Sequence, residues 1–299
     1  MIILFSDRLH FSIGLPCLPD SVAAIWRHLV SFLREQKVLP SVFEVSQMWG
    51  HDPDVQSESN LRLNGEEVGS LIEARKLKGF MVSSGSGSRS CELDFWIPRA
   101  PASGPVKLSC TVGAKAKAPD DWSPLIERIM VDFETIGAWQ WHNRYAYWQG
   151  DSLLDDRYKR LWGEIPPGSI TWIEEKSHPM GEDKVKIDIS KNPGRHKALS
   201  SEVSFHPTAE MWLGRHFWQY AKCTKEEALA ADFWLETRET AHFSYFKCWP
   251  TAFTRPDGEQ GRMQQRLWKL FFHEDCEWPP GSGSICDEPM YGPPELMPS

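Results

Sequence analysis

The sequence lacks any surplus of positive charge. Among its 299 residues, 33 Lys and Arg stand against 41 Asp and Glu, so the formal net charge is −8. Nucleic-acid binding depends on clustered Lys and Arg that neutralise phosphates, so we expect no direct binding to DNA or RNA. No run of about 18 uncharged apolar residues occurs, so we expect neither a membrane-spanning helix nor a membrane partner.

Paired cysteines are also lacking. The seven cysteines form no CxxC pair, and their odd number fits no simple disulfide framework. Free thiols are typical of a reducing cytoplasm, although a bridge between Cys276 and Cys286 stays open. The first residues, MIILFSDRLHFSIG, lack a basic start and soon reach Asp7 and Arg8. They favour a strand over a signal peptide, so we expect a cytoplasmic protein.

Motifs that carry enzymatic chemistry are missing as well. HExxH, the phosphate-binding GxxxxGK[ST] and GxSxG do not occur, and the glycines of residues 79–87 do not fit GxGxxG. The ten histidines are scattered, without the spacing of metal ligands. We therefore expect no enzyme, no catalytic residue, no metal and no cofactor.

Two enzymatic alternatives stay open. Asp156, Glu174 and Lys176 resemble the Asp and Glu-x-Lys of a metal-dependent nuclease, since Glu174 and Lys176 would share one face of a strand. A carbohydrate-active enzyme is the other alternative, because Trp rings can stack on sugars and carboxylates can cleave glycosidic bonds.

Hydrophobic periodicity predicts an α+β fold. Helical spacing predicts helices over 20–37, 64–78, 123–137, 153–162, 224–239 and 257–272. Thr224 and Glu227 form a capping-box pattern, and Ser123 is expected to cap the third helix, with Gly137 just after its end. Strands are predicted over 2–5, 9–13, 79–84, 91–97, 106–113, 168–176, 184–189 and 241–249, the last but one within a polar loop or hairpin at 177–197.

The chain is predicted to form two packed subdomains, each a mostly antiparallel sheet with helices on one face. We place them at residues 1–137 and 138–273 and expect an acidic, Pro-rich tail at 274–299, which contains six acidic residues and no Lys or Arg. Residues 1–121 are nearly balanced in charge, with 13 basic and 14 acidic residues, whereas residues 122–299 contain 20 and 27. The second half should therefore attract a basic partner.

Aromatic residues gather in WQWHNRYAYWQGD at 139–151. On a strand, Trp139, Trp141, Tyr145 and Tyr147 would share one face, and Gln140, His142, Arg144 and Trp148 the other. The first face is predicted to be core. The second face, led by Trp148, could meet water, a helix or another protein.

Three segments resemble the immunity proteins of bacterial polymorphic-toxin systems, in particular the group paired with restriction-endonuclease-like nuclease toxins of type VI secretion. They are CELDFWIPRAPASGPVKLSCTVG, MWLGRHFWQYAKCTKEEALAADF and FSYFKCWPTAFTRPDGEQGRMQQRLWKLFFHEDCEWPP, about a third of the chain, with the second at an unusual position. The resemblance implies an antitoxin that binds one cognate effector and is not an enzyme. An acidic inhibitor can imitate the DNA that a nuclease toxin grips.

Two segments are the predicted contact regions for such a toxin, because loops often carry function. The first is the polar segment at 177–197 and the second is the beginning of the tail. The predicted partner-binding residues are Glu182, Asp183, Lys184, Trp148, Glu274, Asp275, Glu277 and Trp278. Homodimerisation stays open.

Overall fold

The computed structural model describes residues 9–15, 21–47, 61–74, 76–77, 80–85, 91–96, 106–112, 116–142, 145–146, 149, 171–174, 185–188, 192–199 and 203–274. The elements before residue 137 are β1 (Leu9–Leu15), α1 (Ser21–Glu35), β2 (Phe43–Gln47), β3 (Leu61–Leu63), α2 (Gly65–Glu73), β4 (Phe80–Ser84), β5 (Cys91–Trp96), β6 (Val106–Val112) and α3 (Ser123–Asp132).

The later elements begin with β7 at the predicted boundary between the subdomains. They are β7 (Gly137–His142), β8 (Thr171–Glu174), β9 (Val185–Asp188), β10 (Lys197–Ala198), β11 (Ser204–Phe205), β12 (Glu210–Gly214), the 3₁₀ helix η2 (Arg215–Gln219), α6 (Lys225–Leu229), β13 (Glu236–Glu239), β14 (Phe243–Lys247) and α7 (Gly258–Phe272). None of these helices is both long and apolar enough to cross a membrane.

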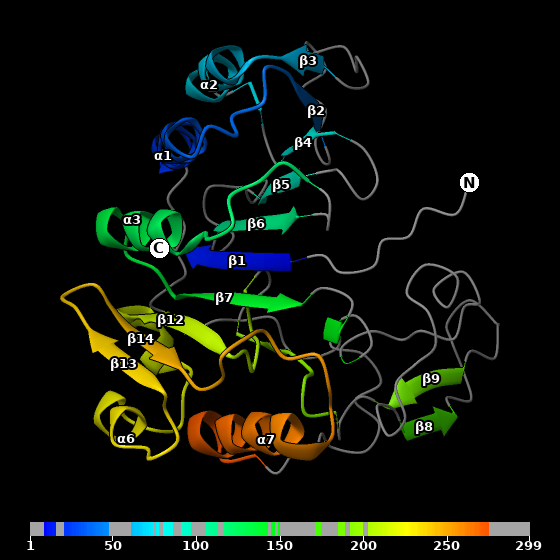
Figure 1. The fold of residues 1–299 in the computed structure, drawn as a ribbon, viewed down its shortest axis with the longest axis vertical. Coiled ribbons are helices and arrows are strands. Elements are labelled where there is room, and N and C mark those ends of the chain that lie inside the picture. The colour runs from blue at the N-terminus through cyan, green and yellow to red at the C-terminus, as the bar shows by residue number, and fades with distance from the viewer. Residues whose placement is uncertain are drawn as a thin grey trace, which may run out of the picture.

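Ten of the described strands form one antiparallel sheet, in the order β13-β14-β12-β7-β1-β6-β5-β4-β2-β3 (Figure 1). The strands of each half are contiguous in this order, and the halves join where β1 pairs with β7. The predicted α+β class with antiparallel sheets is confirmed. The two predicted sheets therefore pair edge to edge, through β1 and β7, and form one continuous sheet.

The helices of the two halves cover opposite faces of this sheet. Ala138 and Trp212 are register partners on neighbouring strands, and both pack into the core cluster formed with α1, α2 and α3. Trp139 and Met211, one position along, pack into a second cluster with η2, α6 and α7. Because side chains alternate along a strand, β7 and β12 separate the two cores. Figure 1 shows α1–α3 beside the upper sheet and α7 below the lower strands.

Capping boxes mark the beginnings of two helices, α2 and α6. Asn64 caps α2 by accepting hydrogen bonds from the backbone of Glu66 and Glu67, and Thr224 caps α6 in a reciprocal capping box with Glu227. The apolar stripe predicted for the first helix is buried along α1, where Leu29 is fully covered.

The end of α3 differs from the prediction. The N-cap is Trp122, without a side-chain capping bond, and the helix ends at Asp132, so Phe133 is extended and Gly137 starts β7. The amide of Ile136 donates to the carbonyl of Gly14 in β1 at 2.8 Å. Pairing with the sheet therefore ends the helix before the apolar periodicity does.

The segment at 224–239 is also corrected. It was predicted as one helix, but α6 ends at Leu229 and residues 236–239 are strand β13. The indole of Trp234 donates to the carbonyl of Ala228 at 2.7 Å, and the amide of Leu235 donates to Lys247 at 2.8 Å. These two bonds turn the chain out of the helix and bring it alongside β14.

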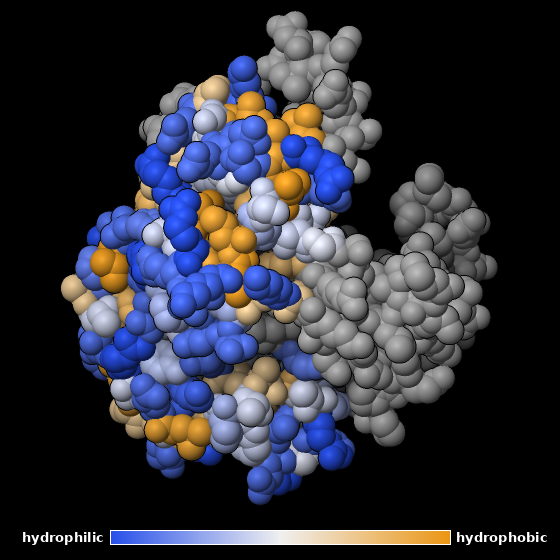
Figure 2. Space-filling model, turned by 45° about the horizontal axis from the view of Figure 1, so that its top comes forward, coloured by the Kyte–Doolittle hydropathy of each residue, from blue (hydrophilic) through white to orange (hydrophobic). Residues whose placement is uncertain are grey.

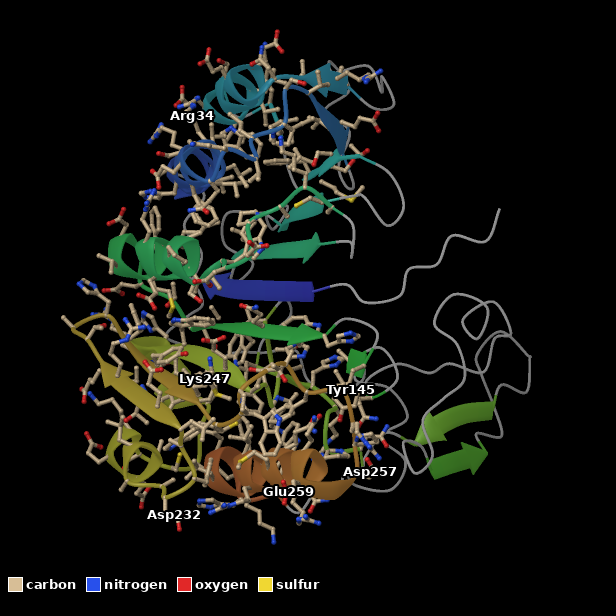
Figure 3. The ribbon with its side chains drawn as sticks, viewed as in Figure 1. Arg34, Tyr145, Asp232, Lys247, Asp257 and Glu259 are labelled. Carbon is tan, nitrogen blue, oxygen red and sulfur yellow. The ribbon has the colours of Figure 1, made fainter. Side chains whose placement is uncertain are left out.

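The aromatic run is a strand only as far as His142. Trp139 is fully buried, and the ring of Trp141 stacks on His206 with centroids 3.9 Å apart. Tyr145 is helical rather than extended, yet it is buried, and its hydroxyl donates to Gln264 of α7 at 3.0 Å. Figure 3 shows Tyr145 beside the beginning of α7. Burial is thus confirmed for Trp139 and Tyr145, whereas Trp141 is half-buried and Tyr147 lies outside the described residues. The strand is shorter than predicted.

Candidate functional site

The predicted partner-binding residues lie almost entirely outside the described part of the chain. Glu274 is described, whereas the other seven are not: Trp148, Glu182, Asp183, Lys184, Asp275, Glu277 and Trp278. Of the residues proposed for the nuclease alternative, Glu174 is the last residue of β8, whereas Asp156 and Lys176 lie outside the described ranges. The same holds for Cys276 and Cys286.

Glu274 is held inside the fold by two cations. Its carboxylate accepts a hydrogen bond from Arg195 at 3.2 Å and forms an ion pair with Lys197 at 3.1 Å. The side chain of Arg195 is fully buried, and its guanidinium carbon lies 4.0 Å from the ring centroid of Trp268. A buried cation is costly without a counter-ion, so Glu274 has a structural role. It also fixes the beginning of the acidic tail against residues 192–199.

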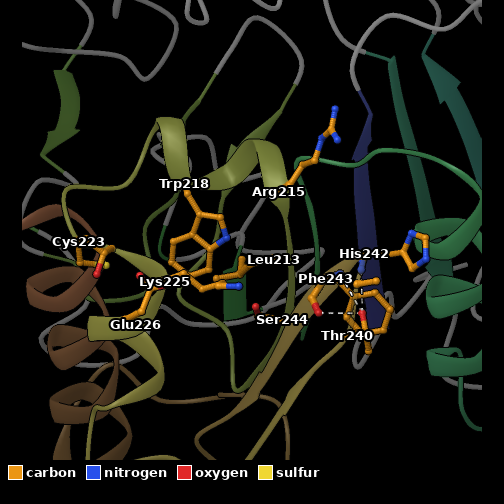
Figure 4. A pocket seen from close by; sticks show the side chains of 12 residues that line it. Leu213, Arg215, Trp218, Cys223, Lys225, Glu226, Thr240, His242, Phe243 and Ser244 are labelled. Atoms are coloured by element: carbon orange, nitrogen blue, oxygen red, sulfur yellow. Dashed lines mark hydrogen bonds between the residues drawn. The ribbon is translucent and has the colours of Figure 1, made fainter.

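An open pocket of about 450 Å³ lies between η2, the beginning of α6 and the hairpin turn of β13 and β14 (Figure 4). Its lining combines apolar rings with hydroxyl groups and charged side chains. It consists of Leu213, Arg215, Trp218, Cys223, Thr224, Lys225, Glu226, Thr240, Ala241, His242, Phe243 and Ser244.

Neighbouring carboxylates neutralise the basic groups of this pocket. Lys225 forms an ion pair with Glu239 of β13, and Arg215 donates to Glu134 at 2.5 Å. Burial raises the pKa of the Cys223 thiol to about 11, so this thiol is protonated at neutral pH. A protonated thiol is a poor nucleophile, and the arrangement fits a contact surface better than a covalent active site.

Strand β13 is the end strand of the ten-stranded sheet, on the side of this pocket. All four of its residues are exposed, and Leu235 just before it is 61% exposed. A strand at the end of a sheet leaves one row of backbone N–H and C=O groups unpaired, which can pair with another chain. Figure 2 shows that the described surface facing the viewer is mostly hydrophilic, with small separate hydrophobic patches.

An ion pair with helix α3 holds β13 in place. Both terminal nitrogens of Arg238 donate to the carboxylate of Glu127 in α3, which also accepts from the Trp212 indole at 3.2 Å. The bonds from Arg238 hold the pKa of Glu127 below its ordinary value. Arg238 also lies over the ring of Tyr245, 5.0 Å from its centroid. These contacts hold the end strand β13 against α3 and β14, so the outer edge of β13 has a fixed position.

The segment leading into this edge is acidic. Between residues 225 and 239, the two cations Lys225 and Arg238 stand against five carboxylates, those of Glu226, Glu227, Asp232, Glu236 and Glu239. We call β13 with Leu235 and the adjoining pocket the acidic edge. Within the described ranges, no group of three or more His, Cys, Asp or Glu residues is placed to hold a metal ion.

Sequence reasoning missed the acidic edge because LETRE continues a strong helical pattern. Strand β13 has four residues, of which three are charged and one is β-branched, so its sequence alone does not predict a strand. The informative signal was the neighbouring aromatic-rich segment at 243–246, which predicted β14. A strand must pair with neighbouring strands, and the residues just before it are one candidate for such a neighbour.

Comparisons with known proteins give little. No known family and no curated protein matches this sequence. Among solved structures, the Pseudomonas aeruginosa T6SS protein PA0821 is similar, with a TM-score of 0.49 and 10% identity. The similarity covers 93% of this chain and 77% of that chain. A likeness of this size is too weak to assign a family or a function.

Proposed function

We propose that this chain is an immunity protein that binds and neutralises a cognate nuclease effector of a type VI secretion system, protecting the producing cell without catalysis of its own. The observation that carries the proposal is the acidic edge, an exposed strand with unpaired backbone groups in the acidic half of the chain. The sequence resemblance to immunity proteins points to the same class.

The electrostatics favour a basic partner. A nuclease binds DNA through clustered Lys and Arg, and an inhibitor with complementary charge associates rapidly with such a surface. The surplus of carboxylates after residue 121 provides this charge, and it includes the acidic edge as well as the acidic tail from residue 274 onward. Aromatic and aliphatic side chains at the rim, such as Leu235, would supply desolvated contacts.

Co-expression with the toxin that we expect a neighbouring gene to encode tests the proposal. We expect the chain to restore growth and to co-purify with the toxin as a stable complex. Loss of both rescue and complex formation would refute the immunity function. As a check on the alternative, purified protein is incubated with DNA and magnesium. Degradation that Glu174→Ala abolishes would identify a nuclease instead.

Charge reversal separates the contact regions. Glu182→Lys with Asp183→Lys, and Asp275→Lys with Glu277→Lys, are each expected to weaken toxin binding, with a larger effect at low ionic strength. Glu44→Lys, an exposed change in the first half, serves as the control. Unchanged affinity in both double variants would remove these two stretches from the interface.

A further inference from the structure

We propose that the effector binds by strand addition, with an extended basic segment pairing along the outer edge of β13 as an eleventh strand of the sheet. This inference rests on the proposed immunity function and specifies how the partner is held. Strand addition gives affinity through backbone hydrogen bonds and specificity through side-chain contacts on alternate residues.

The register identifies which backbone groups are available. The amide of Thr240 donates to the carbonyl of Phe243 at 3.0 Å, so these residues form a hydrogen-bonded pair beside the hairpin turn. Such pairs recur at every second residue of an antiparallel ladder. Arg238 therefore directs its N–H and C=O toward Tyr245 in β14. Thr237 and Glu239 direct theirs away from the sheet, where a new strand would bind.

The two ends of the edge provide side-chain contacts. Leu235, which is 61% exposed, lies at one end. Thr240 lines the 450 Å³ pocket at the other end, and its walls include the apolar ring of Trp218. A strand that follows β13 can thus cover one apolar side chain and insert another into the pocket.

Charge selects a basic strand. Glu236 is exposed, and no described cation forms an ion pair with its carboxylate, while Glu239 has Lys225 as its partner. Lys or Arg opposite Glu236 would gain a cross-strand ion pair. Two copies of this chain would instead bring acidic residues together, so self-pairing is disfavoured. The occupant that the edge fits is therefore a basic segment of the effector.

Proline at position 237 tests the inference. Proline lacks the N–H that a new strand needs, but it is tolerated on an edge strand where that N–H points away from the sheet. Thr237→Val keeps the N–H and is the matched control. The probe is the purified, catalytically inactive domain of the toxin expected from a neighbouring gene, titrated calorimetrically. We expect Thr237→Pro to raise the Kd by about tenfold or more, and Thr237→Val to change it by less than about threefold.

Amide hydrogen exchange on the unmodified complex is an independent test, useful if the proline variant is unstable. Binding should slow exchange at Thr237 and Glu239 and leave Arg238, already paired with β14, unchanged. Tight binding that Thr237→Pro leaves intact, or no new protection at 237 and 239, would overturn strand addition while the immunity function stands. A toxin that does not bind the wild-type chain overturns the proposed function. A dimer of this chain, detected by light scattering and lost in Thr237→Pro, would make the occupant a second copy and overturn the effector strand.

Discussion

Arg195 and Glu274 join the two segments that the sequence marks as separate candidates for partner binding. Their side chains meet at 3.2 Å, with Arg195 fully buried and Glu274 one-fifth exposed. Residue 195 belongs to the end of the polar segment at 177–197, and residue 274 begins the acidic tail. The ion pair therefore fixes the attachment points of both segments to the core beside α7.

Glu274→Gln is expected to destabilise the fold, because it leaves the buried guanidinium of Arg195 without its counter-ion. We expect the free energy of unfolding to fall by about 3 kcal/mol. Urea denaturation followed by circular dichroism measures it. Asp232→Asn, which breaks the exposed pair with Arg266, is the control and should cost less than about 1 kcal/mol. Equal stability of wild type and Glu274→Gln would contradict the structural role.

Stability should depend on the ionisation of Glu127. Since Arg238 lowers its pKa, the carboxylate stabilises the folded state above the ordinary Glu pKa, and this contribution is lost as pH falls through the lowered value. Glu127→Gln should therefore reduce the free energy of unfolding by about 1 kcal/mol at pH 7, with a smaller difference in acid. Denaturation at several pH values measures this. A difference that grows in acid would contradict the prediction.

Gly261 in α7 has no room for a side chain, since an added Cβ would lie 2.0 Å from the carbonyl oxygen of Pro256. Alanine usually favours a helix over glycine, but here the clash should prevail and cost about 1–3 kcal/mol. Thermal unfolding of Gly261→Ala tests this. Gln265→Ala, an exposed position in the same helix, should stay within about 0.5 kcal/mol of wild type. A stabilised Gly261→Ala protein would contradict the packing described.

Cys223 should resist alkylation although it lines the pocket. Its pKa of about 11 keeps the thiol protonated at pH 8, and the residue is buried. Iodoacetamide treatment at pH 8 followed by peptide mass spectrometry should leave Cys223 unmodified in the native protein and modify it in urea. Native labelling as fast as that of a free cysteine would restore Cys223 as a candidate nucleophile.

The sequence by itself determined the elements whose signals are local. Helical periodicity located α1 and α7, and the spacing of Thr224 and Glu227 predicted the cap of α6. Alternation predicted β14 and the burial of Trp139. These features depend on residues within one or two turns or a few strand positions, so each pattern is complete in the sequence. The uneven acidity was equally plain, and it set the expected charge of the partner.

Tertiary structure alone decided the end of α3, the conversion of residues 236–239 into a strand, and the meeting of Arg195 with Glu274. Each depends on a partner that is distant in the sequence: Gly14 for Ile136, β14 for β13, and a side chain 79 residues away for Arg195. Local propensity is worth a fraction of a kcal/mol per residue, whereas strand pairing and a buried charge contribute more. The candidate site could not be predicted for this reason, since its central strand, β13, is stabilised by pairing with β14 and not by its own sequence pattern.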